Sequence, residues 1–345
     1  MSYITFQPKD YFNNKLYTGD GNATNAITGV GFQPDWVWIK NRGTTARHVL
    51  FDAVRGSQKA LFSHLTDAEQ STNQYGTLNS FDSDGFTVAD GSSSGERTNN
   101  SSENYVSWNW KAGGSGSSNT DGVISATVSA DASRGFSIIK YTGSGSASTV
   151  GHGLGAAPDI TIRKKINATG DWFVHTTLID GSFDFLKLNT TDAKSNSSLT
   201  GFTSTTVGVD NDTSQEIIYA FKSIKGFSKF GKYRGTGNAT DGPFIYTGFK
   251  PAFFMLKRTN SSASWVIVDN QRSNTFNPQD RLLFPNTNAA EDGSGETYFF
   301  DFLSNGVKIR TTSGSYGNGN GDTYIYMAFA EQPLVSSNDI PATAR

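Results

Sequence analysis

The sequence contains no cysteine, almost no net charge and no long apolar run, and each absence excludes a class of protein. A chain without cysteine is not a disulfide scaffold, holds no thiolate metal site and has no thiol nucleophile. Its 29 basic and 31 acidic residues nearly cancel, which disfavours binding to nucleic acid or anionic lipid through a basic surface. No apolar run approaches the roughly 18 residues of a membrane span, and the first ten residues lack a basic and apolar leader pattern. We therefore expect a protein made in the cytosol that is neither secreted by a leader nor inserted in a membrane.

The residues that are present indicate a folded protein of several domains. The chain has 345 residues, of which 37 are glycine and 25 are phenylalanine, and 35% are hydrophobic. Large apolar side chains at this frequency are unlike a disordered tract. At about 150 residues per domain, the length alone favours two or three domains.

An internal triplication defines these domains more closely. Each copy begins with a tyrosine and a Gly-x-Gly turn, continues to a proline and then to a lysine six residues further on, and later has an aspartate after an apolar pair. These four landmarks are Tyr17, Pro34, Lys40 and Asp52 in the first copy, Tyr141, Pro158, Lys164 and Asp180 in the second, and Tyr233, Pro251, Lys257 and Asp269 in the third. Landmarks in the same order at similar spacing indicate three related units.

Within each copy the apolar residues alternate along short runs, which are broken by Gly, Asn, Asp and Ser. This pattern is typical of short antiparallel strands joined by turns. A stretch at 53–65 is also compatible with a turn of helix, but the corresponding stretches of the other copies favour a strand. The residues two and four positions after the proline are apolar in every copy (Trp36 and Trp38, Ile160 and Ile162, Phe253 and Met255). The residues three and five positions after it are not apolar in every copy. The closing runs at 105–110, 217–221 and 324–329 behave alike, and together these patterns assign Trp36, Trp38, Trp108 and Trp110 to cores.

These observations predict an all-β protein of three tandem antiparallel β-sandwich modules, jelly-roll-like and related by the internal repeat. The first module, with the N-terminal segment, covers residues 1–111, and a Gly/Ser-rich linker of flexible composition follows at 112–133. The second module covers 134–225 and the third 226–333, and a C-terminal tail occupies 334–345.

Residues that could carry chemistry are present, but each has a simpler structural interpretation. Trp172 and Trp265 are candidates for a ligand surface, although packing in a strand is favoured. The repeated aspartates Asp52, Asp180 and Asp269 suggest catalytic carboxylates only if two of them flank one substrate. One per copy, at the end of an apolar run, is better interpreted as a turn residue whose carboxylate accepts backbone N–H bonds.

The remaining patterns lack the spacing of a functional site. The four histidines, His48, His64, His152 and His175, show no metal-ligand spacing. The run Gly151 to Gly155 lacks the strand and helix of a dinucleotide loop. Asp82 to Gly85 and Gly317 to Asp322 resemble parts of calcium loops without the full ligand set. We therefore predict no catalytic residue, no metal and no cofactor, and no ligand-binding residue is assigned.

The first copy resembles a known family. Its Tyr17-Thr-Gly-Asp-Gly21 opening, its Gly31-Phe-Gln-Pro-Asp-Trp-Val-Trp-Ile-Lys40 strand, its Asp84-Gly-Phe-Thr-Val88 segment and its closing Trp108-Asn-Trp-Lys111 are similar to elements of virion structural proteins of short-tailed marine bacteriophages. The second and third copies keep the layout but lose the tryptophans, so the specific match covers about a third of the chain. The resemblance implies a tail-fibre, host-attachment or capsid-surface component of the virion, and it supplies no catalytic residue.

The expected function is therefore a non-enzymatic virion protein, displayed on a tail fibre for host attachment. A capsid decoration or head-fibre protein is the alternative, and a polysaccharide-degrading tail enzyme is the least favoured. The expected partners are other virion proteins and a host-surface glycan or protein, with no nucleic acid and no membrane insertion. A homotrimer and a single chain that imitates a threefold assembly both stay open.

Overall fold

The computed structural model describes residues 6–71, 73–293 and 299–331, and in these ranges the protein is all-β with antiparallel sheets. The predicted tail at 334–345 lies outside the described residues. Helical structure among the described residues is confined to the short 3-10 turn η1 (Pro8–Asp10). No helix in the described part of the chain has the length and apolar character needed to cross a membrane.

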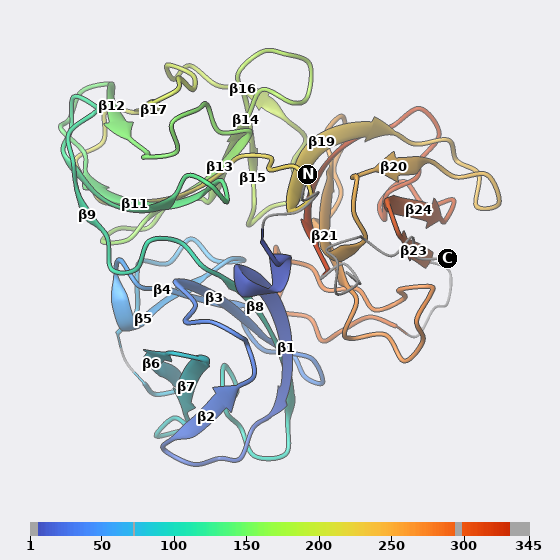
Figure 1. The fold of residues 1–345 in the computed structure, drawn as a ribbon, viewed down its shortest axis with the longest axis horizontal. Coiled ribbons are helices and arrows are strands. Elements are labelled where there is room, and N and C mark those ends of the chain that lie inside the picture. The colour runs from blue at the N-terminus through green and yellow to red at the C-terminus, as the bar shows by residue number, and fades with distance from the viewer. Residues whose placement is uncertain (1–5, 72, 294–298, 332–345) are drawn as a thin grey trace.

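The strands form a larger and a smaller sheet in each third of the chain (Figure 1). In the first third, the larger sheet has the order β1 (Phe12–Thr18), β8 (Asn104–Trp110), β3 (Trp36–Asn41), β4 (Val49–Asp52) and β5 (Gly56–Phe62), and the smaller has the order β2 (Asn25–Thr28), β7 (Gly85–Ala89) and β6 (Thr77–Asp82). The stretch at 53–65 contains β5, so the preference for a strand there is confirmed.

The second and third parts repeat this order with variations. The second has an eight-stranded sheet, β16 (Ser195–Asn196), β15 (Asp184–Lys187), β14 (Phe173–Thr176), β13 (Ile160–Lys165), β18 (Gln215–Phe221), β11 (Phe136–Thr142), β10 (Ala126–Asp131) and β9 (Ser117–Asn119), and a pair, β12 (Ser148–Gly151) with β17 (Thr206–Val209). The third has β19 (Ser228–Arg234), β25 (Thr323–Ala330), β21 (Pro251–Arg258) and β22 (Val266–Asp269), and a smaller sheet of β20 (Phe244–Tyr246), β24 (Gly306–Arg310) and β23 (Phe299–Leu303).

Both faces of the larger sheets are buried, but in different cores. The side chains of Val37 and Ile39 on β3 face the smaller sheet of their own third, where a cluster includes Phe86 and Val88. Trp36 and Trp38, on the opposite face of the same strand, belong to a cluster to which all three thirds contribute. The members from the three larger sheets include Trp108, Trp110, Ile138, Ile160, Ile162, Tyr219, Phe253, Met255, Met327 and Phe329.

This arrangement corrects the expectation that each strand buries one face in its own sandwich. The four tryptophans assigned to cores are buried, as predicted, but their core is the shared one at the centre of the molecule. The intervening positions are buried as well, even where they are polar. Arg163 on β13 is buried and forms an ion pair with Asp210 at 2.7 Å, which offsets the cost of removing its charge from water.

The three parts contact one another through corresponding backbone groups. In each part, one backbone N–H donates to the carbonyl eight residues after the proline of the next part, at 2.8–2.9 Å. The pairs are Glu69 with Ile166, Lys194 with Thr259, and Glu291 with Arg42. The three contacts close a ring around the shared core, and Figure 1 shows the three groups of strands arranged about a common centre.

The segment 112–133 differs from the flexible linker that its composition predicts. It contains β9 and β10, which extend the second sheet beyond β11 in antiparallel register. Gly and Ser residues fit this hairpin because its tight turns and close backbone contacts need small side chains. Gly116, for example, has a φ of +85° and lies against Val128.

Candidate functional site

The three repeated aspartates do not meet in one site. Asp52 Oδ1 accepts the N–H of Arg55 at 2.8 Å, Asp180 Oδ1 accepts that of Ser182 at 2.9 Å, and Asp269 Oδ1 accepts that of Arg272 at 3.2 Å. The prediction that these carboxylates accept backbone N–H bonds in turns is therefore confirmed. Two of the three aspartates also form buried ion pairs, Asp52 with Arg55 and Asp269 with Arg272.

Each of these buried carboxylates also binds a side chain from another part of the chain. Tyr219 donates its hydroxyl to Asp52 at 2.7 Å, and Trp108 Nε1 donates to Asp269 at 2.9 Å. An aspartate that is neutralised by arginine, saturated with donors and closed to solvent is not available to a substrate as an acid or a base. These groups hold the three parts together.

Trp172 and Trp265 are completely buried, so the surface-ligand hypothesis for them is wrong and packing is confirmed. Trp172 Nε1 donates to the carbonyl of Phe62 at 2.8 Å, and Trp265 Nε1 donates to the carbonyl of Lys187 at the same distance. Both bonds cross from one part of the molecule to the preceding one. The indoles are therefore further contacts of the central ring.

The histidines do not gather in one site: His48 and His64 are neighbours in the first part, and His152 and His175 belong to the second. His48 is buried and its Nδ1 accepts the Trp38 Nε1 hydrogen at 3.0 Å, while His152 Nδ1 accepts the N–H of Leu154 at 3.1 Å. Burial lowers the pKa of His175 to about 3, and its ring stacks on Phe183. No group of three potential metal ligands occurs among the described residues.

The loops that resemble calcium sites are occupied by internal contacts. Asp84 accepts the N–H groups of Gly29 and Gly31 at 3.0 and 2.7 Å, and so fixes the β2 end of the smaller sheet. Asn318 is buried and bridges to the Gly-x-Gly turn through the N–H of Thr236 at 2.6 Å. Asp322 forms an ion pair with Arg258 at 2.6 Å. These loops are built as turns.

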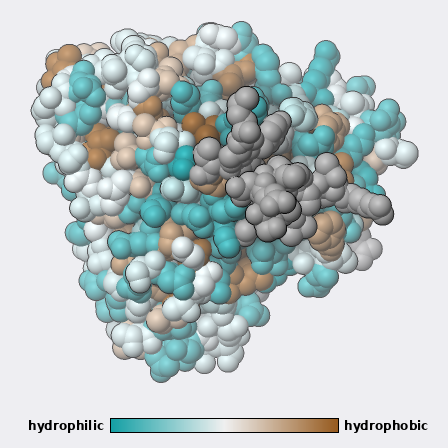
Figure 2. Space-filling model, viewed as in Figure 1, coloured by the Kyte–Doolittle hydropathy of each residue, from teal (hydrophilic) through white to brown (hydrophobic). Residues whose placement is uncertain are grey.

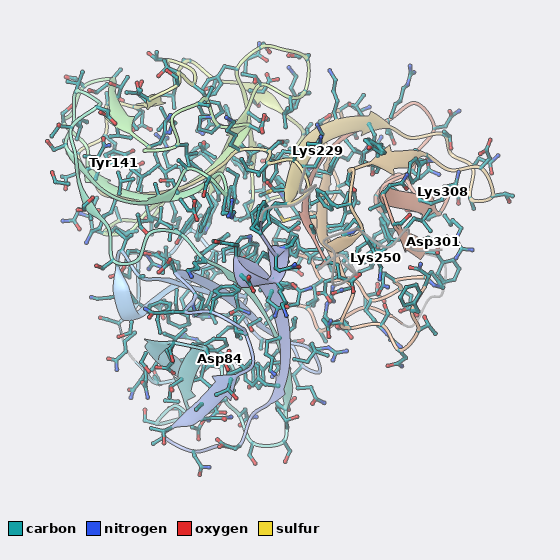
Figure 3. The ribbon with its side chains drawn as sticks, viewed as in Figure 1. Asp84, Tyr141, Lys229, Lys250, Asp301 and Lys308 are labelled. Carbon is teal, nitrogen blue, oxygen red and sulfur yellow. The ribbon has the colours of Figure 1, made fainter. Side chains whose placement is uncertain are left out.

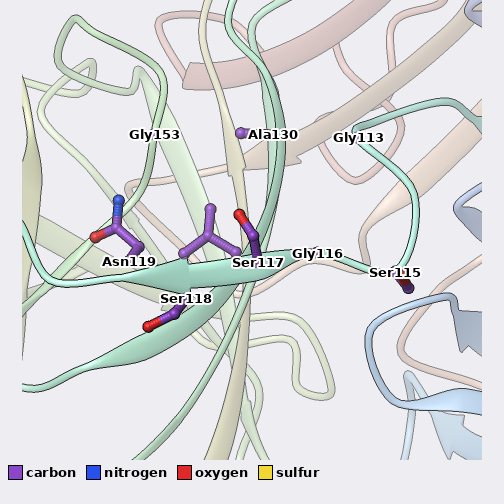
Figure 4. Close-up of a pocket in the computed structure, with 9 residues that line it drawn as sticks. Gly113, Ser115, Gly116, Ser117, Ser118, Asn119, Ala130 and Gly153 are labelled. Carbon is purple, nitrogen blue, oxygen red and sulfur yellow. The ribbon is translucent and has the colours of Figure 1, made fainter.

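Two shallow polar hollows lie beside the hairpin of β9 and β10. One, of about 290 Å³, is lined by Ser115, Ser117, Asn119 and neighbouring glycines (Figure 4). The other, of about 350 Å³, is lined by Thr127, Lys140, Gln215 and neighbouring residues. Neither hollow is lined by an aspartate or a glutamate, so neither contains a pair of carboxylates.

A third surface is distinguished by exposed aromatic rings. Phe244 and Tyr246 on β20 are 45% and 66% exposed, and Leu303 at the end of β23 is 39% exposed. Ile245, between the two rings, points the other way into the core of the third part. We call the outer face formed by Phe244, Tyr246, Leu303 and Gly306 the aromatic surface. On the face visible in Figure 2, by contrast, hydrophobic residues are scattered among hydrophilic ones.

Strand register arranges this surface in two rows. Tyr246 pairs with Gly306, which pairs with Leu303, and this row is apolar. Phe244 pairs with Lys308, which pairs with Asp301, and this row adds charge. Asp301 and Lys308 lie on neighbouring strands at the outer side of the third part (Figure 3).

The landmarks that the three copies share do not include this surface, although the sequence contains a signal for it. In corresponding register, the first part has Ala26 and Thr28 where the third has Phe244 and Tyr246. Comparison of these strands between copies, rather than of the landmarks that the copies share, would have revealed the two aromatic substitutions.

Comparisons with known proteins identify a family without a known function. A family model described as a domain of unknown function, DUF7483, matches residues 7–333, which include all three copies. No curated protein matches the chain, and no solved structure matches it.

Proposed function

The chain belongs to the DUF7483 family, and we propose that it is a non-enzymatic structural protein of a bacteriophage virion, a tail-fibre component for host attachment. The resemblance of the first copy to virion proteins of short-tailed phages supports the location. The aromatic surface is the observation that carries the attachment role, because large apolar side chains exposed together on one sheet face are typical of binding sites.

We further propose that the architecture is three tandem, jelly-roll-like β-sandwich modules related by the internal repeat, at 1–111, 134–225 and 226–333. The shared strand order supports this proposal, as does the separate apolar cluster between the larger and the smaller sheet in each part. The hairpin at 112–133 belongs to the second module in this scheme.

The proposed partners follow from this location. Other virion proteins of the tail anchor the chain, and a glycan or protein of the host surface is its target. No catalytic residue, metal or cofactor enters the proposal.

A capsid decoration or head-fibre protein is the second candidate. The arrangement of the three parts around one centre favours it, because a three-lobed body suits a surface component better than an extended shaft (Figure 1). The two candidates predict different positions on the particle.

Immunogold labelling of intact particles of the encoding phage tests both candidates. Label on the tail is the expected result, label on the head shell would favour the decoration protein, and unlabelled particles would contradict a virion protein altogether. Incubation of the purified protein with host-surface polysaccharide is expected to release no reducing ends. Their release would contradict the non-enzymatic role.

A further inference from the structure

We propose that the aromatic surface is a carbohydrate-binding site, on which Phe244 and Tyr246 stack against adjacent sugar rings of a host-surface glycan. This inference rests on the proposed function and names the chemical class of its target. Four observations carry it: the exposure of the rings, the polar groups beside them, the size of the surface and its restriction to the third part.

Both rings lie close to glycines. A Cβ built on Gly306 would approach the ring of Phe244 to 2.7 Å, and one built on Gly248 would lie 3.6 Å from the Tyr246 hydroxyl. The absence of a side chain at Gly306 leaves room for the Phe244 ring close to the backbone, whereas the Tyr246 hydroxyl is at an ordinary van der Waals distance from the Cβ position of Gly248. Both residues stay open to solvent, Phe244 at 45% and Tyr246 at 66% exposure.

Polar groups lie beside the rings at the same level. Lys308, directly across from Phe244, donates to the carbonyl of Gly242 and approaches Asp241 at 3.5 Å, and the Asp241 side chain is 90% exposed. A hexose has an apolar C–H face that stacks on aromatic rings, and its hydroxyls need hydrogen-bond donors and acceptors around those rings. The Lys308 ammonium has three hydrogens and the Asp241 carboxylate two acceptor oxygens, so both have capacity to spare.

The size of the surface argues against a protein partner. From their exposed fractions, the three apolar side chains offer on the order of 300 Å². A stable protein interface buries about 800 Å² on each partner, of which somewhat more than half, or about 450 Å², is apolar. Two aromatic residues whose backbone positions are about 6.6 Å apart along one strand fit a short stretch of a sugar chain better.

The other two parts show that the fold does not need these rings. The first part has exposed Ala26 and Thr28 at the two positions. The second has Thr149 and Gly151, and there the connecting segment covers the face: a Cβ on Gly151 would meet the Asn119 side chain at 1.7 Å, and the N–H of Val123 bonds to Thr149. Among the described residues, aromatic rings left open to solvent therefore occur in the third part alone, which indicates a role other than folding.

The test compares the full-length protein with two variants on an array of neutral and acidic oligosaccharides and on purified host-surface polysaccharide. The double variant F244A/Y246T installs the residues of the first part, so we expect it to fold, and an unchanged thermal midpoint verifies this. We expect affinity for the bound saccharide to fall at least about tenfold. The control V123A removes an apolar side chain that is 84% exposed in the second part, away from the aromatic surface, and its affinity should equal wild type.

Three results would overturn the inference: no saccharide bound by the wild-type protein, equal binding by F244A/Y246T, or equal losses in both variants. If the wild-type protein retained a host protein and F244A/Y246T did not, the target of the aromatic surface would be a protein and not a glycan. Particle labelling tests the proposed function separately, because a virion protein that binds no saccharide would keep that function and lose only this site.

Discussion

Asp52 and Asp269 occupy corresponding positions, paired with Trp36 and Phe253, whereas the second part has Thr176 across from Ile160 and its aspartate, Asp180, follows four residues later. Asp52 and Asp269 bind a buried arginine and accept a hydrogen bond from the closing strand of another part, through Tyr219 and Trp108 respectively. The closing strand of the third part has Met327 at the position that Trp108 and Tyr219 occupy in the other two, and a methionine side chain has no hydrogen to donate. The remaining aspartate, Asp180, is exposed and pairs with Lys194.

We expect Asp269→Ala to lower the free energy of unfolding by about 3 kcal/mol, because it leaves the Arg272 guanidinium buried with only Glu291 as a charged partner. Urea unfolding followed by tryptophan fluorescence measures this loss. Asp180→Ala is the matched control and should leave the midpoint close to wild type. Equal losses in both variants would show that the buried pair has no special weight.

Three buried lysines predict an unusual response to alkaline pH. Burial lowers the pKa of Lys40 to about 7 and those of Lys164 and Lys257 to about 8, from 10.5. Between about pH 8 and 10 the unfolded chain therefore binds more protons, and stability rises with pH by up to about 1.4 kcal/mol per pH unit for each lysine. Above pH 10 the trend reverses, since burial raises the pKa of Tyr324 and Tyr326 to about 12 and their ionisation then favours the unfolded chain.

Urea midpoints at about pH 8 and 9.5 test this expectation. The increase in the urea midpoint between these two pH values should be smaller in Lys164→Met than in wild type. It should be unchanged in Lys229→Met, which alters an exposed lysine of β19. A midpoint that is flat or falls over this window would contradict the assignment of buried lysines.

At the scale of the element, the smaller sheets depend on tight hairpins as well as on apolar alternation. The turn between β6 and β7 ends at Gly85, which has a φ of +143° and lies against the carbonyl of Ile27 on β2. A side chain at this position would separate the two strands. The sequence shows the turn, but the approach of β2 appears only in three dimensions.

We expect Gly85→Ala to cost at least about 2 kcal/mol, because it combines backbone strain with a Cβ 2.0 Å from the Ile27 oxygen. Gly56→Ala is the comparison. Gly56 also has a positive φ, of +92°, but no atom lies within 4 Å of its Cβ position, so only strain is added. Thermal unfolding of the two variants measures the difference, and a Gly85→Ala variant as stable as Gly56→Ala would contradict the close approach.

At the scale of the whole molecule, the shared core makes the three parts interdependent. Trp36, Tyr219 and Phe253 come from different parts and belong to one buried cluster. Removal of one part would expose the apolar faces of the other two larger sheets. The three parts thus surround one core as the subunits of a trimer do, although their larger sheets have five, eight and four strands.

We expect the full-length chain to unfold in a single transition, with coincident curves from far-UV circular dichroism and tryptophan fluorescence. A fragment of residues 134–225 should lack a cooperative transition, because it exposes Ile160, Ile162 and Tyr219. Separate transitions in the full-length chain, or a fragment that folds on its own, would contradict this coupling.

The sequence by itself determined the all-β class and the burial of the central tryptophans, because alternation and turn residues act locally. It also predicted the turn role of the aspartates. The tertiary structure alone decided that the faces of Trp36 and Trp38 meet two other sheets, that 112–133 is a hairpin, and that Phe244 and Tyr246 remain exposed. A period of two marks a face as apolar without naming its partner, and the partner depends on contacts between residues far apart in the chain.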